Sequence, residues 1–300
     1  MEQTKVQANG YQFIQAYDAQ KCIDKRCMWT GCVNEPINSH TLSLASIKRV
    51  APLDSLISIK KSTFNAVKRK ENRIHFKTSD THTTTFPGFC KVHDSTIFAD
   101  LDNFSGLVTD KIAVLNHYRM LCFALYQVQN QFEQERFLRE APYEGKGGKK
   151  ITEYFRVLRK GYWHNALIKN EEEIISRKLI CEKMIQNEQY KIYKRIVLGA
   201  KDNPLFTGRA GIFFHGFSRT MYKGTLDHLP HIIYSTLHDG EKSHLLFTLL
   251  PIDSKYIDDI TTFTTHPDFL KRLEYLIYKE SDFCIVSNKQ HLPQINKILG

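Results

Sequence analysis

The clearest hydrophobic pattern in the chain begins at about residue 108. Apolar side chains recur there mostly three or four positions apart, at Val108, Ile112, Leu115, Tyr118, Met120, Leu121, Leu125 and Val128. This period gives an amphipathic helix one apolar stripe, so the spacing predicts a helix over about 108–138. Residues 141–148 combine Pro142 with three glycines and predict a break after that helix.

A second helical pattern runs over 151–197, as one helix or as two pieces that meet near Gly161. Its apolar positions share one side of the predicted helix and are Ile174, Ile175, Leu179, Ile180, Met184, Ile185 and Ile192. Because a short turn joins two long helices here, the pattern predicts that they pack as an antiparallel hairpin.

Short apolar runs dominate the chain after residue 204 and predict strands. The runs are 212–214, 231–235 and 244–250, and the dipeptide Asp239-Gly240 between the last two predicts a β-hairpin turn. A helix near 267–278 and a strand over 283–286 complete this pattern. In the first hundred residues, the alternation over 72–77 fits a strand, and no long helical period is present.

The order of these elements predicts an α+β fold in three parts. The parts are 1–107, 108–200 with the helical hairpin, and 201–300 with a small α+β unit; a chain of 300 residues is long enough for two or three units. No apolar run reaches about 18 residues, and the first ten residues lack the charged-then-apolar layout of a secretory signal. We therefore expect a cytoplasmic protein with no membrane association.

The chain carries a formal net charge of +10 and has a pI near 9.1. This excess of Lys and Arg favours an acidic partner, most simply the phosphate backbone of a nucleic acid. The densest basic stretch contains six candidate nucleic-acid-binding residues, Lys60, Lys61, Lys68, Arg69, Lys70 and Arg73. We expect this stretch to form a basic strand pair that projects and follows a phosphate backbone; the alternative is a solvated lysine-rich loop.

Two short pairs of residues predict a zinc site. Cys27 and Cys32 are separated by four residues, and Cys90 and His93 by two, which gives a set of three thiolates and one imidazole. Structural zinc is held by four such ligands in a tetrahedron, and two local pairs build the usual site. The alternative is that these are ordinary buried thiols and a surface histidine. Cys22 competes for a ligand position, because its spacing to Cys27 equals that of Cys27 to Cys32.

The neighbouring residues favour the zinc interpretation. Gly31 directly precedes Cys32, and Gly88 lies two positions before Cys90, so both halves have the backbone freedom that tight knuckle turns need. The other cysteines, Cys122, Cys181 and Cys284, fall on apolar patterns and are expected in the core. An odd number of cysteines, seven, favours free thiols and metal ligands over disulfides.

Over roughly residues 20–105 these motifs resemble a known family. The order Cys27-x4-Cys32, Ser39-His40-Thr41 and Gly88-Phe89-Cys90-x2-His93-Asp94 is similar to the treble-clef zinc module of the HNH (ββα-metal) endonucleases. It is more closely similar to an uncharacterised group of bacterial proteins with a Cys-x4-Cys…Ser-His…Gly-Phe-Cys-x2-His-Asp pattern. The resemblance implies that 1–107 is a zinc-binding, treble-clef, HNH-like domain.

The resemblance also implies two catalytic residues. His40, eight residues after Cys32, matches the histidine that lies beside the catalytic metal and would act as general base. Asp94 matches the metal-binding position and would hold Mg²⁺ or Mn²⁺ through oxygen. The alternative for His40 is a structural side chain that packs under the knuckle.

The sequence departs from the family pattern at three places. The metal ligand that often lies one turn further along the helix has no firm counterpart in residues 95–98. The family's second knuckle commonly reads Cys-x2-Cys-His, whereas His93 stands here at the second Cys position and Asp94 at the His position. The middle Asn of the family name has no counterpart in residues 83–87. These departures concern the catalytic metal and leave the zinc ligands intact.

Two functions follow as expectations. The first is a zinc-stabilised, metal-dependent HNH-like nuclease that cleaves nucleic acid phosphodiesters, with DNA expected before RNA as the substrate. The alternative is a non-catalytic, zinc-dependent nucleic-acid-binding or adaptor protein with a degenerate HNH site. The long helices are a further candidate surface for a protein partner or for self-association.

Overall fold

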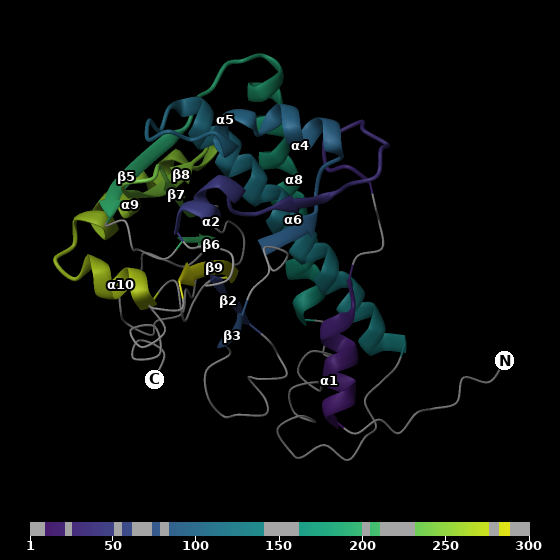
Figure 1. The fold of residues 1–300 in the computed structure, drawn as a ribbon. Coiled ribbons are helices and arrows are strands. Elements are labelled where there is room, and N and C mark those ends of the chain that lie inside the picture. The colour runs from purple at the N-terminus through teal and green to yellow at the C-terminus, as the bar shows by residue number, and fades with distance from the viewer. Residues whose placement is uncertain are drawn as a thin grey trace.

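The computed structural model describes residues 10–21, 26–50, 56–61, 74–78, 84–140, 162–199, 205–210, 232–275 and 282–288. The helices are α1 (Gly10–Ala19), α2 (Leu44–Val50), α4 (Lys91–Ile97), α5 (Ala99–Asp102), α6 (Asp110–Glu140), α8 (Tyr162–Gln186), α9 (Ile257–Thr265) and α10 (Phe269–Tyr275), with a 3₁₀ helix η3 at Pro251–Tyr256 (Figure 1). Together with two antiparallel sheets they confirm the predicted α+β class. Among the described residues, no helix is long and apolar enough to cross a membrane.

The two sheets differ greatly in size. The small sheet pairs β1 (Asn38–His40) with β4 (Thr85–Pro87), and His40 lies opposite Thr85. The large sheet has seven strands in the order β3-β2-β9-β6-β7-β8-β5. Their bounds are β2 (Leu56–Lys61), β3 (Ile74–Thr78), β5 (Tyr193–Gly199), β6 (Leu205–Ala210), β7 (Ile232–His238), β8 (Ser243–Leu249) and β9 (Asp282–Asn288).

The large sheet draws strands from all three predicted parts of the chain. It contains β2 and β3 from 1–107, β5 from 108–200, and four strands from 201–300. The basic strand pair therefore forms, but it does not project from the zinc region as expected, because β2 also pairs with β9. Whether 1–107, 108–200 and 201–300 fold as separate units stays a prediction.

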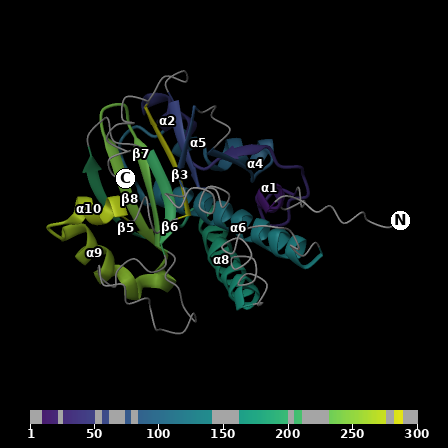
Figure 2. The ribbon, with the colours of Figure 1, turned by 90° about the horizontal axis from the view of Figure 1, so that it is seen from below.

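The two long helices pack side by side, as predicted (Figures 1 and 2). Tyr118 on α6 contacts Glu182 on α8, while Glu135, further along α6, contacts His164 near the start of α8. The contacts therefore run in opposite directions along the two helices, which confirms an antiparallel pair. The α6 helix spans almost the range predicted, and the expected break at 141–148 lies outside the described residues.

The predicted second helix ends earlier than expected. After Gln186 the chain turns through Glu188, which has a left-handed backbone with φ of 52°. The N–H of Gln189 donates to the carbonyl of Met184, and the N–H of Glu188 donates to that of Ile185, the pattern of a Schellman C-cap. The prediction of helix up to residue 197 was wrong, because strand β5 begins at Tyr193.

The C-terminal elements follow the predictions closely. β7 and β8 form the hairpin around Asp239-Gly240. Helix α10 lies within the range expected for a helix, 267–278, and strand β9 includes the whole range expected for the last strand, 283–286. Helix α9 was not anticipated, and the run 212–214 lies outside the described residues. Figure 2 shows α9 and α10 on one side of the large sheet and the α6–α8 pair on the other.

A single hydrophobic core connects the N-terminal region with the long helices and the sheet. It includes Phe89 and Phe98 beside α4, Tyr118 of α6, and Leu246 of β8. Cys122 and Cys181 are fully buried within it, as predicted; nothing is described of the Cys284 side chain. The α6 helix therefore positions the candidate zinc residues relative to the sheet.

Candidate metal centre

The first two ligand candidates lie on a tight loop of residues 26–37, called the knuckle loop below. The N–H of Cys27 donates to the carbonyl of Asn34 at 2.9 Å, and that of Cys32 to the carbonyl of Trp29 at 3.0 Å. Gly31 adopts φ of 83°, a left-handed conformation that glycine reaches without strain. The turn therefore directs both thiols toward the same point.

The other two candidates lie where strand β4 passes into helix α4. Cys90 is the N-cap residue of α4, and His93 lies in its first turn. The N–H of Met28 donates to the carbonyl of Gly88 at 2.8 Å and joins this segment to the knuckle loop. A Cβ at Gly88 would lie 2.7 Å from the ring of Phe86, so only glycine fits there without movement.

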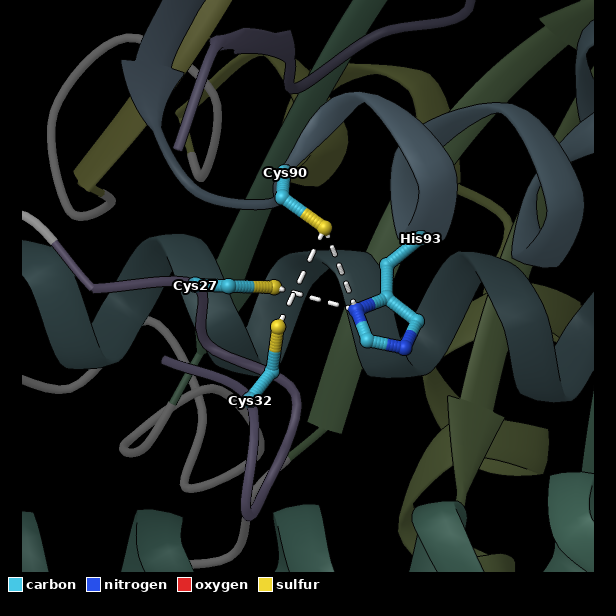
Figure 3. A group of neighbouring side chains, drawn as sticks. All are labelled: Cys27, Cys32, Cys90 and His93. Carbon is cyan, nitrogen blue, oxygen red and sulfur yellow. Dashed lines mark hydrogen bonds between the residues drawn. The ribbon is translucent and has the colours of Figure 1, made fainter. Parts of the chain in front are cut away.

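The four side chains converge as Figure 3 shows. His93 Nδ1 lies 3.3 Å from the sulfur of Cys27 and 3.3 Å from that of Cys90, and the sulfurs of Cys32 and Cys90 are 3.9 Å apart. All four donor atoms lie within 4.8 Å of one another. Zinc bonds of about 2.0–2.3 Å give a tetrahedron with edges of roughly 3.5–3.8 Å, so these atoms surround a space of the correct size for zinc.

The thiols have unequal electrostatic environments. Burial raises the pKa of Cys27 to about 11, which favours its neutral form when no cation is present. Burial also acts on Cys90, but hydrogen bonds from the His93 backbone and from Cys27 and Cys32 outweigh it and lower its pKa. A cation at the centre would stabilise both thiolates and release the protons that they carry.

These residues form the one group of three or more possible metal ligands in the part of the chain that the structure describes. No protein family, curated protein or solved structure matches the chain. The cluster could bind a metal such as zinc, and this rests on the geometry of the chain itself. Cys22, the competing ligand, lies outside the described residues.

A ring stack and a buried polar network hold the knuckle loop against the long helices. Trp29 stacks on His93 with ring centroids 5.4 Å apart, and it makes a T-shaped contact with Tyr118 with ring centroids 6.0 Å apart. Beside it, Glu182 Oε1 accepts hydrogen bonds from the N–H of Thr30 at 3.1 Å and the hydroxyl of Tyr118 at 2.7 Å. The same oxygen accepts a third hydrogen bond, from Lys178 Nζ at 2.7 Å.

This network is almost closed to solvent. Lys178 and Glu182 are 6% and 3% exposed, and Lys178 also donates to the hydroxyl of Thr30 at 3.0 Å. The sequence patterns did not indicate Thr30, Lys178 and Glu182 as contributors to the site. The opposite charges four positions apart on a helix were visible in the sequence, but their partner Thr30 lies about 150 residues away and could not be identified from it.

Of the two predicted catalytic residues, Asp94 lies on the helix that carries His93, whereas His40 lies on a strand without a ligand candidate. His40 ends strand β1 and is partly exposed, and Asp94 follows His93 in the first turn of α4. One carboxylate oxygen of Asp94, Oδ1, is buried and has no hydrogen-bond partner among the described residues. Within those residues, His40 and Asp94 belong to no cluster of three or more possible ligands.

The structure describes the basic stretch only in part. Lys60 and Lys61 lie in β2, opposite His75 and Ile74 of β3, but nothing is described of their side chains. Lys68, Arg69, Lys70 and Arg73 lie outside the described residues. Their role in binding nucleic acid stays a prediction.

Proposed function

We propose that the protein is a zinc-stabilised, metal-dependent nuclease with an HNH-like treble-clef module. The observation that carries the proposal is the arrangement of elements around the four ligand candidates: the knuckle loop, the antiparallel strand pair β1–β4 and then α4. This is the order expected of a treble clef. Phe89 donates its N–H to the Ser39 hydroxyl at 3.0 Å, which ties the residue before His40 to the residue before Cys90.

Zinc has a structural role in this proposal. Four protein ligands fill a tetrahedral coordination shell, whereas catalytic zinc sites keep one position for water or substrate. Cys27, Cys32, Cys90 and His93 would therefore join the knuckle loop to α4 without taking part in the reaction.

The reaction would be supported by His40 and Asp94. A neutral imidazole at His40 takes the proton from the water that attacks a phosphodiester. A buried carboxylate oxygen without a partner is costly, so Asp94 Oδ1 suits a divalent cation. Mg²⁺ or Mn²⁺ bound there would stabilise the negative charge that develops on the phosphate.

The second candidate function is a zinc-dependent nucleic-acid-binding or adaptor protein without catalysis. The observation in its favour is that, in the described part of the chain, His40 and Asp94 belong to no group of three or more possible metal ligands. The net charge of +10 fits both functions equally, because both require contacts with phosphates.

Cleavage assays on variants distinguish the two functions. Purified protein is incubated with plasmid DNA, single-stranded DNA and RNA, each with Mg²⁺, with Mn²⁺ and with EDTA. The nuclease proposal expects metal-dependent cleavage that falls about 10²–10⁴-fold in His40→Ala, the usual loss for a general base. Asp94→Asn should lose activity as well and should require more Mg²⁺.

The matched control is Ser95→Ala, because Ser95 is exposed, lies next to Asp94 and, among the described residues, has the carbonyl of Val92 as its one side-chain hydrogen-bond partner. It should cleave like the wild type. Retained nucleic-acid binding with no cleavage under any metal condition would favour the adaptor. A lower melting temperature in His40→Ala, with unchanged activity per folded molecule, would make His40 a packing residue and end the catalytic proposal.

A further inference from the structure

Helix α8 has two faces with different surroundings. One face is buried and includes Ile174, Arg177 and Cys181; α8 packs against α6, and Arg177 pairs with Asp253 of η3. A second face carries six residues, all exposed except the partly exposed Ile180: Glu172, Ile175, Ser176, Leu179, Ile180 and Lys183. We call this set the outer face of α8.

The outer face exposes large apolar side chains. Ile175 and Leu179 are each 39% exposed, and Ile180 beside them is partly exposed. Glu172 and Lys183 are exposed at the two ends, and neither side chain has an ion-pair partner among the described residues. They are 11 residues apart, or about 16 Å along the helix, so they cannot pair with each other within one chain.

The pattern of the outer face is symmetric about its centre. Reversing the helix around the midpoint between positions 177 and 178 exchanges Glu172 with Lys183, Ile175 with Ile180, and Ser176 with Leu179. In an isologous interface between two antiparallel copies of a helix, each residue faces, in the other copy, the residue with which this reversal exchanges it. The two residues of each exchanged pair must therefore fit together. Opposite charges then meet at both ends, isoleucines meet isoleucines, and the small Ser176 leaves room for Leu179.

We propose that the outer face of α8 binds the outer face of α8 in a second copy of this chain, with the two helices antiparallel. Charge complementarity selects this occupant and this orientation. An antiparallel pair brings each Glu172 against Lys183 of the other copy, twice per dimer, whereas a parallel pair would bring like charges together. This self-association goes beyond the proposed function, and neither depends on the other.

Charge reversals on the full-length protein test the proposal. The molar mass is measured by light scattering after size-exclusion chromatography and by sedimentation equilibrium over a range of protein concentrations. Glu172→Lys and Lys183→Glu should each raise the dimer dissociation constant by about tenfold, because like charges then face each other. The double reversal restores both pairs and should return the constant to within about threefold of the wild type. Glu241→Lys, on the exposed β7–β8 turn, is the matched charge control and should have no effect.

Ile175→Asp tests the apolar part of the face and should give a monomer at concentrations where the wild type is a dimer. A monomeric wild type would overturn the proposal, and so would a dimer that neither the charge reversals nor Ile175→Asp weakens. If the wild type is a monomer and Ile175→Asp melts at a lower temperature than the wild type, the chain's own residues cover this face. Loss of dimer in both single reversals without recovery in the double reversal would exclude the antiparallel pairing.

Discussion

The hydroxyl of Tyr118 on α6 donates a hydrogen bond of 2.7 Å to Glu182 on α8. The same carboxylate oxygen accepts the N–H of Thr30, three residues after Cys27 in the knuckle loop. Three segments that are far apart in the sequence therefore meet at one buried oxygen. Since Trp29 also lies between His93 and Tyr118, the metal centre and the helical pair are joined through neighbouring residues of one loop.

Removing the charge of Glu182 should destabilise the whole protein. In Glu182→Gln the buried ammonium of Lys178 loses its ion pair, and breaking one partner of a buried pair costs about 3–5 kcal/mol. The measurement is the free energy of unfolding from urea titration at pH 7. Glu241→Gln, an exposed change of the same chemistry, should stay within about 0.5 kcal/mol of the wild type. A similarly small effect of Glu182→Gln would contradict a stabilising role for this network.

The contribution of Glu182 should depend on pH. Burial by itself would raise the pKa of Glu182, but hydrogen bonds from Lys178, Thr30 and Tyr118 outweigh it, so its pKa lies below the usual value. The ionised form is therefore favoured in the folded state, and its stabilisation is complete above the unfolded pKa of about 4.3 and is lost as the pH falls through the folded pKa. The difference in unfolding free energy between wild type and Glu182→Gln, measured from pH 7 to pH 3, should shrink only below about pH 4–5. A difference that grows on acidification would contradict the sign of this shift.

Gly88 should not tolerate a side chain. The Cβ of Gly88→Ala would lie 2.7 Å and 2.8 Å from two ring carbons of the buried Phe86, and overpacking of this kind costs about 1–3 kcal/mol. Because Gly88 also accepts the N–H of Met28, we expect both a lower melting temperature and a faster loss of zinc to a chelator. Ser95→Ala provides an exposed control in the same module. A Gly88→Ala protein as stable as the wild type would show that the Phe86 ring can move aside.

Binding of nucleic acid should depend strongly on salt and on the basic stretch. We expect Lys60, Lys61, Lys68, Arg69, Lys70 and Arg73 to neutralise phosphates, and each lost contact should lower the slope of log affinity against log salt by roughly 0.7–0.9. Fluorescence anisotropy with labelled single- and double-stranded oligonucleotides at several salt concentrations measures this slope. An unchanged slope after all six are replaced by Ala would show that another surface binds the phosphates.

Local patterns predicted much of the structure. The apolar period from Val108 predicted α6, Asp239-Gly240 predicted the β7–β8 hairpin, and the spacings of Cys27, Cys32, Cys90 and His93 predicted the cluster. In each case the residues that set the structure are close together, or belong to two short motifs with a strong chemical preference for the same ion. Periodicity and ligand chemistry act over such short distances and can be recognised in one sequence.

The remaining features depend on contacts between distant residues. Leu56 of β2 lies opposite Asn288 of β9, and no local pattern indicates which strands pair across more than two hundred residues. Strand β5 was mistaken for helix because Ile192 continues the helical spacing, whereas the left-handed backbone at Glu188 ends the helix. The link between Thr30 and Glu182 likewise arises only after the knuckle loop packs on the helices.

The most direct test of the account is the metal content and ligand set of the purified protein. We predict one zinc ion per chain by native mass spectrometry, and X-ray absorption with three sulfur ligands at about 2.3 Å and one nitrogen ligand at about 2.0 Å. Cys90→Ala should lose the zinc and should not fold normally, because the binding energy of structural zinc, about 10 kcal/mol or more, is part of the folding energy. A cooperatively folded wild-type protein that contains no zinc, with Cys27, Cys32 and Cys90 all free to react with a thiol reagent, would contradict the account.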